Sequence, residues 1–224
     1  MKLTWLKWGA VPLAVLVSAA GATVVLAQDQ PSSQSSSAAP TPAPDAEKKP
    51  IIEQRKENQQ DRIADGVKSG ELTAGETANL EKKEAAINKE TRTDRAANGG
   101  KLTGAEKAQI NHQQNQMSKQ IYADKHNANT AHYGNNKVGQ RRENQQDRIA
   151  QGIKSGQLTA GETAKLEKQQ QGINKQVATD RKANGGTLTA SQKRQVNKEQ
   201  NQASKNIYRK KHNAKTQPGA TPKP

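Results

Sequence analysis

Four basic residues near the C-terminus are spaced so that they could bind anions together. They stand four, seven and four positions apart: Arg194, Lys198, Lys205 and Arg209. At about 100° per residue, a helix would place all four within about 60° of one another. The apolar residues of the same segment would project to the opposite side: Val196, Ala203 and Ile207. The spacing therefore predicts a helix with a basic face, and such a face attracts anionic groups.

A second group of residues has oxygen atoms at a spacing that suits calcium. Asp65, Ser69 and Glu76 stand at positions 1, 5 and 12 of one segment, with Gly70 at position 6. This segment resembles the EF-hand loop, whose side chains converge six to eight oxygens on the ion. Val67 occupies position 3 and offers no ligand, so the same residues also suit a simple turn between two helices. We predict no metal site; Asp65, Ser69 and Glu76 are the candidate ligands if one exists.

Other residue types give no indication of catalysis. The histidines do not form a His-x-x-x-His pair, and His126 and His212 are expected to end helices, where a cation complements the helix dipole. Motifs for a nucleophilic serine, a phosphate-binding loop or a dinucleotide are missing. Carboxylates such as Glu76 and Glu81 are expected on solvent-exposed faces. The sequence predicts a protein that is not an enzyme and needs no cofactor.

Composition limits both the chemistry and the core. The 224 residues include no Cys, which excludes disulfides, thiolate zinc sites and a cysteine nucleophile. Hydrophobic residues make up 30 % and aromatic residues 2 %, so a single large apolar core is not expected. With 36 Lys+Arg against 21 Asp+Glu, the net charge of +15 favours anionic partners. Because aromatic side chains are scarce, any binding to nucleic acid would depend on phosphate contacts.

An internal duplication organises the chain. Residues 57–64 return as residues 143–150, and this offset of 86 holds without a gap. Residues 51–130 contain 13 basic and 12 acidic residues, a net charge of +1. Residues 137–216 contain 18 and 6, a net charge of +12. Two similar scaffolds thus differ mainly in charge, which indicates that the second copy is the anion-binding one.

Each copy is predicted to fold into three helices. Four Thr-x-x-Glu or Thr-x-x-Gln motifs follow glycine turns and predict capped helix starts: Thr73–Glu76, Thr103–Glu106, Thr159–Glu162 and Thr189–Gln192. Apolar residues recur at helical spacing after each motif, and no stretch alternates with a period of two. The predicted fold is all-α, with two tandem three-helix units formed as helical hairpins or bundles. The sequence leaves open whether the two units dock against each other.

The glycine turns carry a wider resemblance. Ser69-Gly70-x-Leu72-Thr73-x-x-Glu76 returns in the second copy as Ser155-Gly156-x-Leu158-Thr159-x-x-Glu162. With these turns, the chain resembles exported bacterial helical-repeat proteins of unknown function, a resemblance that implies no activity.

The N-terminus predicts export. Lys2 and Lys7 precede an apolar run, and Val25-Leu26-Ala27 suits cleavage before Gln28. An uncleaved membrane anchor is the alternative, since the run approaches the about 20 residues that span a bilayer. The expected organisation is a signal peptide at 1–27, a disordered linker at 28–50, helical repeat 1 at 51–130, a joint at 131–140, helical repeat 2 at 137–216 and a disordered tail at 217–224. We expect a periplasmic or secreted protein whose mature form does not span a membrane.

Three functions fit these features. The first is an exported helical repeat protein that binds anionic polymers or envelope surfaces through its basic second copy. The second is a structural protein of the cell envelope without a specific ligand. The third is a weak calcium-binding module. No small-molecule substrate is evident from the sequence.

Overall fold

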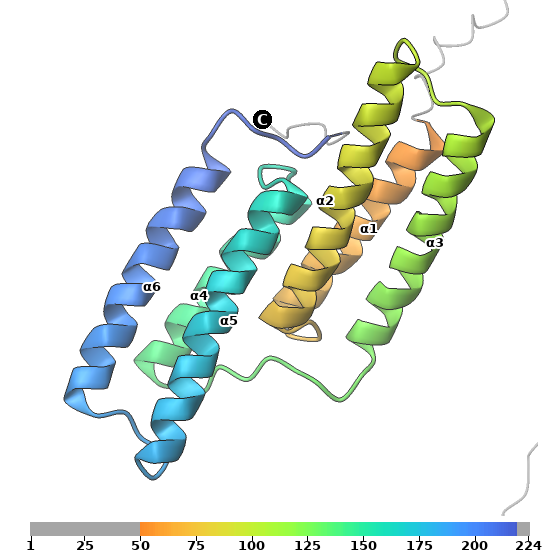
Figure 1. Cartoon of the computed structure of the whole chain (residues 1–224). Coiled ribbons are helices and arrows are strands. Elements are labelled where there is room, and N and C mark those ends of the chain that lie inside the picture. Colours follow the sequence, from red (N-terminus) through yellow and green to blue (C-terminus); the bar gives the residue numbers. More distant parts are fainter. Residues whose placement is uncertain (1–49, 219–224) are drawn as a thin grey trace, which may run out of the picture. The chain divides into compact units, whose positions relative to one another are not determined.

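A computed structural model of the chain describes residues 50–218 (Figure 1). The predicted signal peptide, nearly all of the predicted linker and the last residues of the tail lie outside this range. The described residues form six α-helices and no strand, which confirms the all-α prediction with three helices from each copy. The helices are α1 (Ile51–Ser69), α2 (Ala74–Ala97), α3 (Gly104–Lys125), α4 (Lys137–Lys154), α5 (Ala160–Ala183) and α6 (Ala190–Lys211).

Local chemistry sets where the helices begin. At the start of α2, the Thr73 hydroxyl accepts the N–H of Glu76, and the Glu76 carboxylate accepts the N–H of Thr73 at 2.9 Å. The same reciprocal pair forms at the other three predicted motifs, at the starts of α3, α5 and α6. Gly70 ends α1 at φ 77°, a left-handed conformation that glycine adopts at little cost. The capping predictions are therefore confirmed.

The two copies pack into one bundle. α2 packs most extensively against α5, and α1 against α4, so the closest helix pairs join one copy to the other. The remaining two helices, α3 and α6, lie at opposite edges (Figure 1), where α3 contacts α1 and α2 and α6 contacts α4 and α5. Four central helices, two from each copy, are thus flanked by one outer helix on each side.

The larger of two apolar clusters in the described residues runs through both copies, and the smaller, which includes Val138, Ile173 and Val196, lies within the second copy. The larger cluster joins Ile63, Val67 and Leu80 of the first copy to Ile149 and Leu166 of the second. Every apolar residue of the predicted helical stripes is buried, including Val196, Ala203 and Ile207 on α6. The docking that the sequence left open therefore occurs, and the larger apolar cluster is shared between the copies.

The seam between α2 and α5 contains buried carboxyl groups, which corrects one prediction. We expected Glu81 at the surface, but it is fully buried, as is Glu167 at the equivalent position of the second copy. The prediction was wrong because it assumed that α2 has one packed face, whereas α2 packs against both α3 and α5. Gln60 donates to Glu81 at 3.2 Å, and Gln146 donates to Glu167 at 2.9 Å.

Burial changes the protonation of these carboxyl groups. Desolvation raises the pKa of Glu167 to about 8 and that of Glu84 to about 7. Desolvation also raises the pKa of Glu81 well above its ordinary value, and the nearby charges of Glu84 and Glu167 add to this effect. The seam is therefore most stable when these carboxyls are protonated.

The ordered part of the chain extends beyond the predicted boundary at residue 217. Gln217 is buried, and its N–H donates to the Gly156 carbonyl at 2.8 Å. Its side-chain oxygen accepts the N–H of Ala160 at 2.8 Å, at the start of α5. Composition could not reveal this contact, because it joins residues that are 57 positions apart. Gln217 therefore belongs to the helical part of the protein.

Candidate anion-binding surface

The basic residues predicted on the last helix form an exposed stripe, the α6 stripe, defined as Arg194, Lys198, Lys205 and Arg209. All four are exposed, while the apolar residues on the other side of α6 are buried. Within residues 50–218, no member of the α6 stripe makes an ion pair with a carboxylate. The predicted basic face therefore exists, and its charges are not neutralised by ion pairs within this range.

The C-terminal half of the α6 stripe borders a cleft of about 440 Å³ between α4 and α6. Lys205 and Arg209 line it together with Arg148, whose guanidinium donates to the Ser204 carbonyl at 3.5 Å. Burial and the charge of Arg148 lower the pKa of Lys211, at the end of α6. Arg148, Lys205 and Arg209 thus place three cations around one cleft, which favours an anion.

A second basic cluster lies at the other end of α6 and was not predicted. A cleft of about 720 Å³ is lined by Lys137, Arg141, Arg181 and Lys193, with no acidic residue among its lining. The four residues come from three helices, so no single helical spacing reveals them. A comparison of the two copies could have given a hint, since Ile51 occupies the position equivalent to Lys137. Arg194 and Lys198 do not line either cleft.

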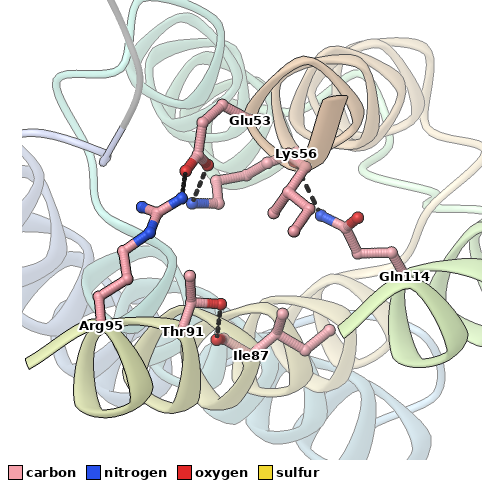
Figure 2. A network of polar contacts seen from close by, with 7 residues as sticks. Glu53, Lys56, Ile87, Thr91, Arg95 and Gln114 are labelled. Carbon is pink, nitrogen blue, oxygen red and sulfur yellow. Dashed lines mark hydrogen bonds and ion pairs between the residues drawn. The ribbon is translucent and has the colours of Figure 1, made fainter. Parts of the chain in front are cut away.

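In the first copy, the counterparts of Arg181 and Arg142 are neutralised by one carboxylate. Figure 2 shows Glu53 between Arg95 and Lys56, at 2.5 Å and 3.1 Å respectively. Although burial opposes ionisation, the hydrogen bond from Arg95 and the charge of Lys56 hold the pKa of Glu53 below its ordinary value. Glu53 is therefore a charged internal partner that compensates two basic side chains.

The second copy has lost this carboxylate. Gly139 stands where Glu53 stands in the first copy, and a Cβ there would collide with the carbonyl oxygens of Tyr133 and Gly134. The joint between the copies thus occupies the space. The remaining cations are Arg142 and Arg181, equivalent to Lys56 and Arg95. Within residues 50–218, Arg142 and Arg181 therefore have no acidic partner, unlike their counterparts in the first copy.

The candidate calcium ligands do not converge. Asp65 pairs with Lys154 of the second copy at 3.1 Å, and the Ser69 hydroxyl donates to the Gly66 carbonyl at 3.3 Å. Glu76 caps α2 and also accepts hydrogen bonds from Asn127 and Asn129 at 2.8 Å and 3.2 Å. Within residues 50–218, no group of three or more His, Cys, Asp or Glu side chains is placed to hold a metal ion.

The role of Glu76 can be tested by its effect on stability. We expect Glu76→Ala to lower the free energy of unfolding by about 1 kcal/mol, because the hydrogen bonds that the carboxylate accepts from Thr73, Asn127 and Asn129 are lost, while the backbone N–H of residue 76 still donates to the Thr73 hydroxyl. Glu76→Gln should lose less, since Gln192 caps α6 in the same way. Millimolar calcium should leave the melting temperature of all three proteins unchanged. A calcium-dependent rise in the wild type that Glu76→Ala abolishes would instead support the calcium module.

The two equivalent histidines end their helices, as predicted. His126 and His212 stack on Tyr122 and Tyr208, with ring centroids 4.1 Å apart in both cases. Each imidazole Nδ1 lies within hydrogen-bond distance of the same tyrosine's carbonyl, at 2.7 Å and 2.8 Å. Their recurrence in both copies is explained by helix termination.

None of the helices within residues 50–218 has the length and apolar character needed to cross a membrane. Compared with known proteins, the chain matches no family model, no curated protein and no solved structure.

Proposed function

We propose that the protein is an exported, non-enzymatic helical repeat protein that binds anionic polymers or envelope surfaces through its second copy. The observation that carries the proposal is the α6 stripe, whose four charges are exposed on one face without an ion pair in the described residues. At the equivalent positions the first copy has Ala108, His112, Lys119 and Ala123. The stripe is thus specific to the second copy.

Binding at this surface would be driven by charge. A cationic stripe that contacts a polyanion releases condensed counterions, so affinity falls steeply as salt rises. Tyr208 is the one exposed aromatic residue within α6, and it stacks on His212 rather than alternating with other rings. Base stacking and sequence readout are therefore not expected. The predicted signal peptide supports a periplasmic or secreted location.

A charge-matched pair of variants tests the proposal on the full chain. The stripe variant replaces the four residues of the α6 stripe by Gln, which keeps helix propensity similar. The control replaces four exposed cations of the first copy by Gln and has the same net charge: Lys82, Lys83, Lys89 and Arg92. On a heparin column, the stripe variant should elute at much lower salt. In a plot of the logarithm of the heparin-binding constant against the logarithm of the salt concentration, the line for the stripe variant should be less steep by about 3 units, with little change in the control.

The other outcomes have distinct meanings. Equal losses in both variants would show that net charge alone controls retention, which contradicts a role for the α6 stripe. Unchanged retention in the stripe variant would favour the structural envelope protein without a specific ligand. Circular dichroism of each variant should match the wild type, because all substituted residues are exposed.

A further inference from the structure

A cleft of about 380 Å³ lies where the start of α2, the joint and the helix α5 meet. We call it the joint cleft. Its basic lining residues are His132, Arg142, Lys175 and Arg181, and no acidic residue lines it. Ala74 and Gly75, the first residues of α2, form part of its wall. The joint cleft shares Arg181 with the 720 Å³ cleft but contains no member of the α6 stripe.

The second copy shows what kind of acceptor the first N–H of such a helix binds. There the side-chain oxygen of Gln217 accepts the N–H of Ala160, the first residue of α5. The equivalent residue of the first copy is Ala131, whose methyl group offers no acceptor. Within residues 50–218, the N–H of Ala74 consequently has no acceptor. The joint cleft therefore presents an open amide at a helix N-terminus, where partial positive charge accumulates.

A buried cation supplies a second, independent indication of an anion. Arg142 is only 5 % exposed, and its guanidinium donates to the neutral oxygens of Tyr133 and Asn174 at 2.7 Å and 2.9 Å. Its Nε is buried without an acceptor. Desolvation and the charge of Arg181 lower the pKa of Arg142. A buried charge that lacks a counter-ion is costly, so an anion in the joint cleft would be stabilised.

Arg181 is the second guanidinium that lines the joint cleft. It is partly buried, and its side chain has no hydrogen bond or ion pair with another residue in the range 50–218. Its counterpart Arg95 holds the carboxylate of Glu53 (Figure 2). Comparison of the copies thus shows two groups that lack the partner their counterparts have: Arg181 has no carboxylate like that of Glu53, and within residues 50–218 the N–H of Ala74 has no acceptor like that of Gln217.

We propose that the joint cleft binds the carboxylate of a ligand. A guanidinium fork matches a planar carboxylate, and helix N-termini bind carboxylates through their free N–H groups. The internal counterparts, the Glu53 carboxylate and the Gln217 amide, are planar groups of this kind. The cleft volume of about 380 Å³ leaves room for the unit that carries the carboxylate, such as the sugar ring of a uronate. This proposal does not depend on the α6 stripe.

Calorimetric titration of the full chain with galacturonic acid and with trigalacturonate tests the proposal. We expect saturable millimolar binding of galacturonic acid, and no binding of neutral galactose. If galacturonic acid and trigalacturonate bind with similar molar affinity, the site takes one carboxylate-bearing unit. If trigalacturonate binds more tightly, the natural ligand is a polymer of such units. The Ala74 amide resonance should shift on binding. Tighter binding of inorganic phosphate than of galacturonic acid, or no saturable binding of either galacturonate, would overturn the proposal.

Two variants remove the site in different ways. Ala131→Gln places the second copy's acceptor beside Ala74 without changing the charge, so it should weaken galacturonate binding about tenfold and raise the melting temperature. Arg181→Gln should weaken binding to a similar extent. Lys182→Gln is the matched control, because Lys182 is exposed and does not line the cleft. Equal binding by wild type, Ala131→Gln and Arg181→Gln would contradict the assignment.

The variant of the α6 stripe separates this proposal from the proposed function. It should bind galacturonic acid as the wild type does, even though its retention on heparin falls. If the stripe variant loses galacturonate binding while Arg181→Gln keeps it, the carboxylate is bound at the α6 stripe and the joint cleft is not the site.

Discussion

Replacing Glu167 by Gln should raise the free energy of unfolding at pH 9 by roughly 3–5 kcal/mol and leave it nearly unchanged at pH 4. In the native protein, the carboxyl of Glu167 keeps its proton up to about pH 8, because burial raises its pKa to that value. In the unfolded chain the same carboxyl ionises near its ordinary pKa of 4.5. Between these values the native state binds more protons, so stability falls as pH rises. Glutamine resembles the protonated acid at every pH and removes this loss.

Urea unfolding followed by circular dichroism at pH 4, 6.5 and 9 measures the effect. Glu143→Gln is the matched control, because Glu143 is exposed and lies in the same copy. The second copy already has Gln170 where the first has the buried Glu84, so the seam accommodates glutamine. Some pH dependence should remain in Glu167→Gln, since Glu81 and Glu84 also have raised pKa values. Identical pH profiles for wild type and Glu167→Gln would contradict the buried carboxyl.

A fragment with one copy alone should not fold. Separating residues 51–131 from residues 137–218 would expose Leu80 and Ile149, which are fully buried in the shared core, together with the carboxyl of Glu81. Exposure of one core side chain costs about 1.5–3 kcal/mol, and the cluster contains many of them. We expect each fragment to show little helical signal at 222 nm and no cooperative thermal transition.

Cutting the joint without removing either copy is the control. Gly134 and Asn135 are exposed, so a protease site placed between them should yield two chains that stay associated and helical. Mixing the separate fragments should restore the helical signal for the same reason. A single fragment that melts cooperatively on its own would show that the copies are independent domains. Because the single-copy fragments are not expected to fold, the basic surface is tested with full-chain variants.

Local sequence determined the helices and the α6 stripe. The Thr-x-x-Glu motifs act within one helical turn, so Thr73 and Glu76 meet wherever the rest of the chain goes. The basic face of α6 was also predictable, because Val196 and Ile207 bury one side of the helix and leave the other to solvent. Both features depend on residues that are close in sequence.

Tertiary packing decided the polar seam and the joint cleft. α2 buries a second stripe at four- and three-residue spacing, and every member is polar: Thr77, Glu81, Glu84, Asn88 and Thr91. A hydropathy pattern predicts that such residues are solvent-exposed, because it identifies a buried position only by an apolar side chain. Only the docking of α5 onto α2 places Glu81 in the interior, and only the course of the joint places Ala74 near Arg181. The contacts between α2 and α5 join segments about 86 residues apart, and the joint is held by contacts such as that of the Ala131 N–H with the Gly70 carbonyl, 61 residues apart, so no local pattern encodes either.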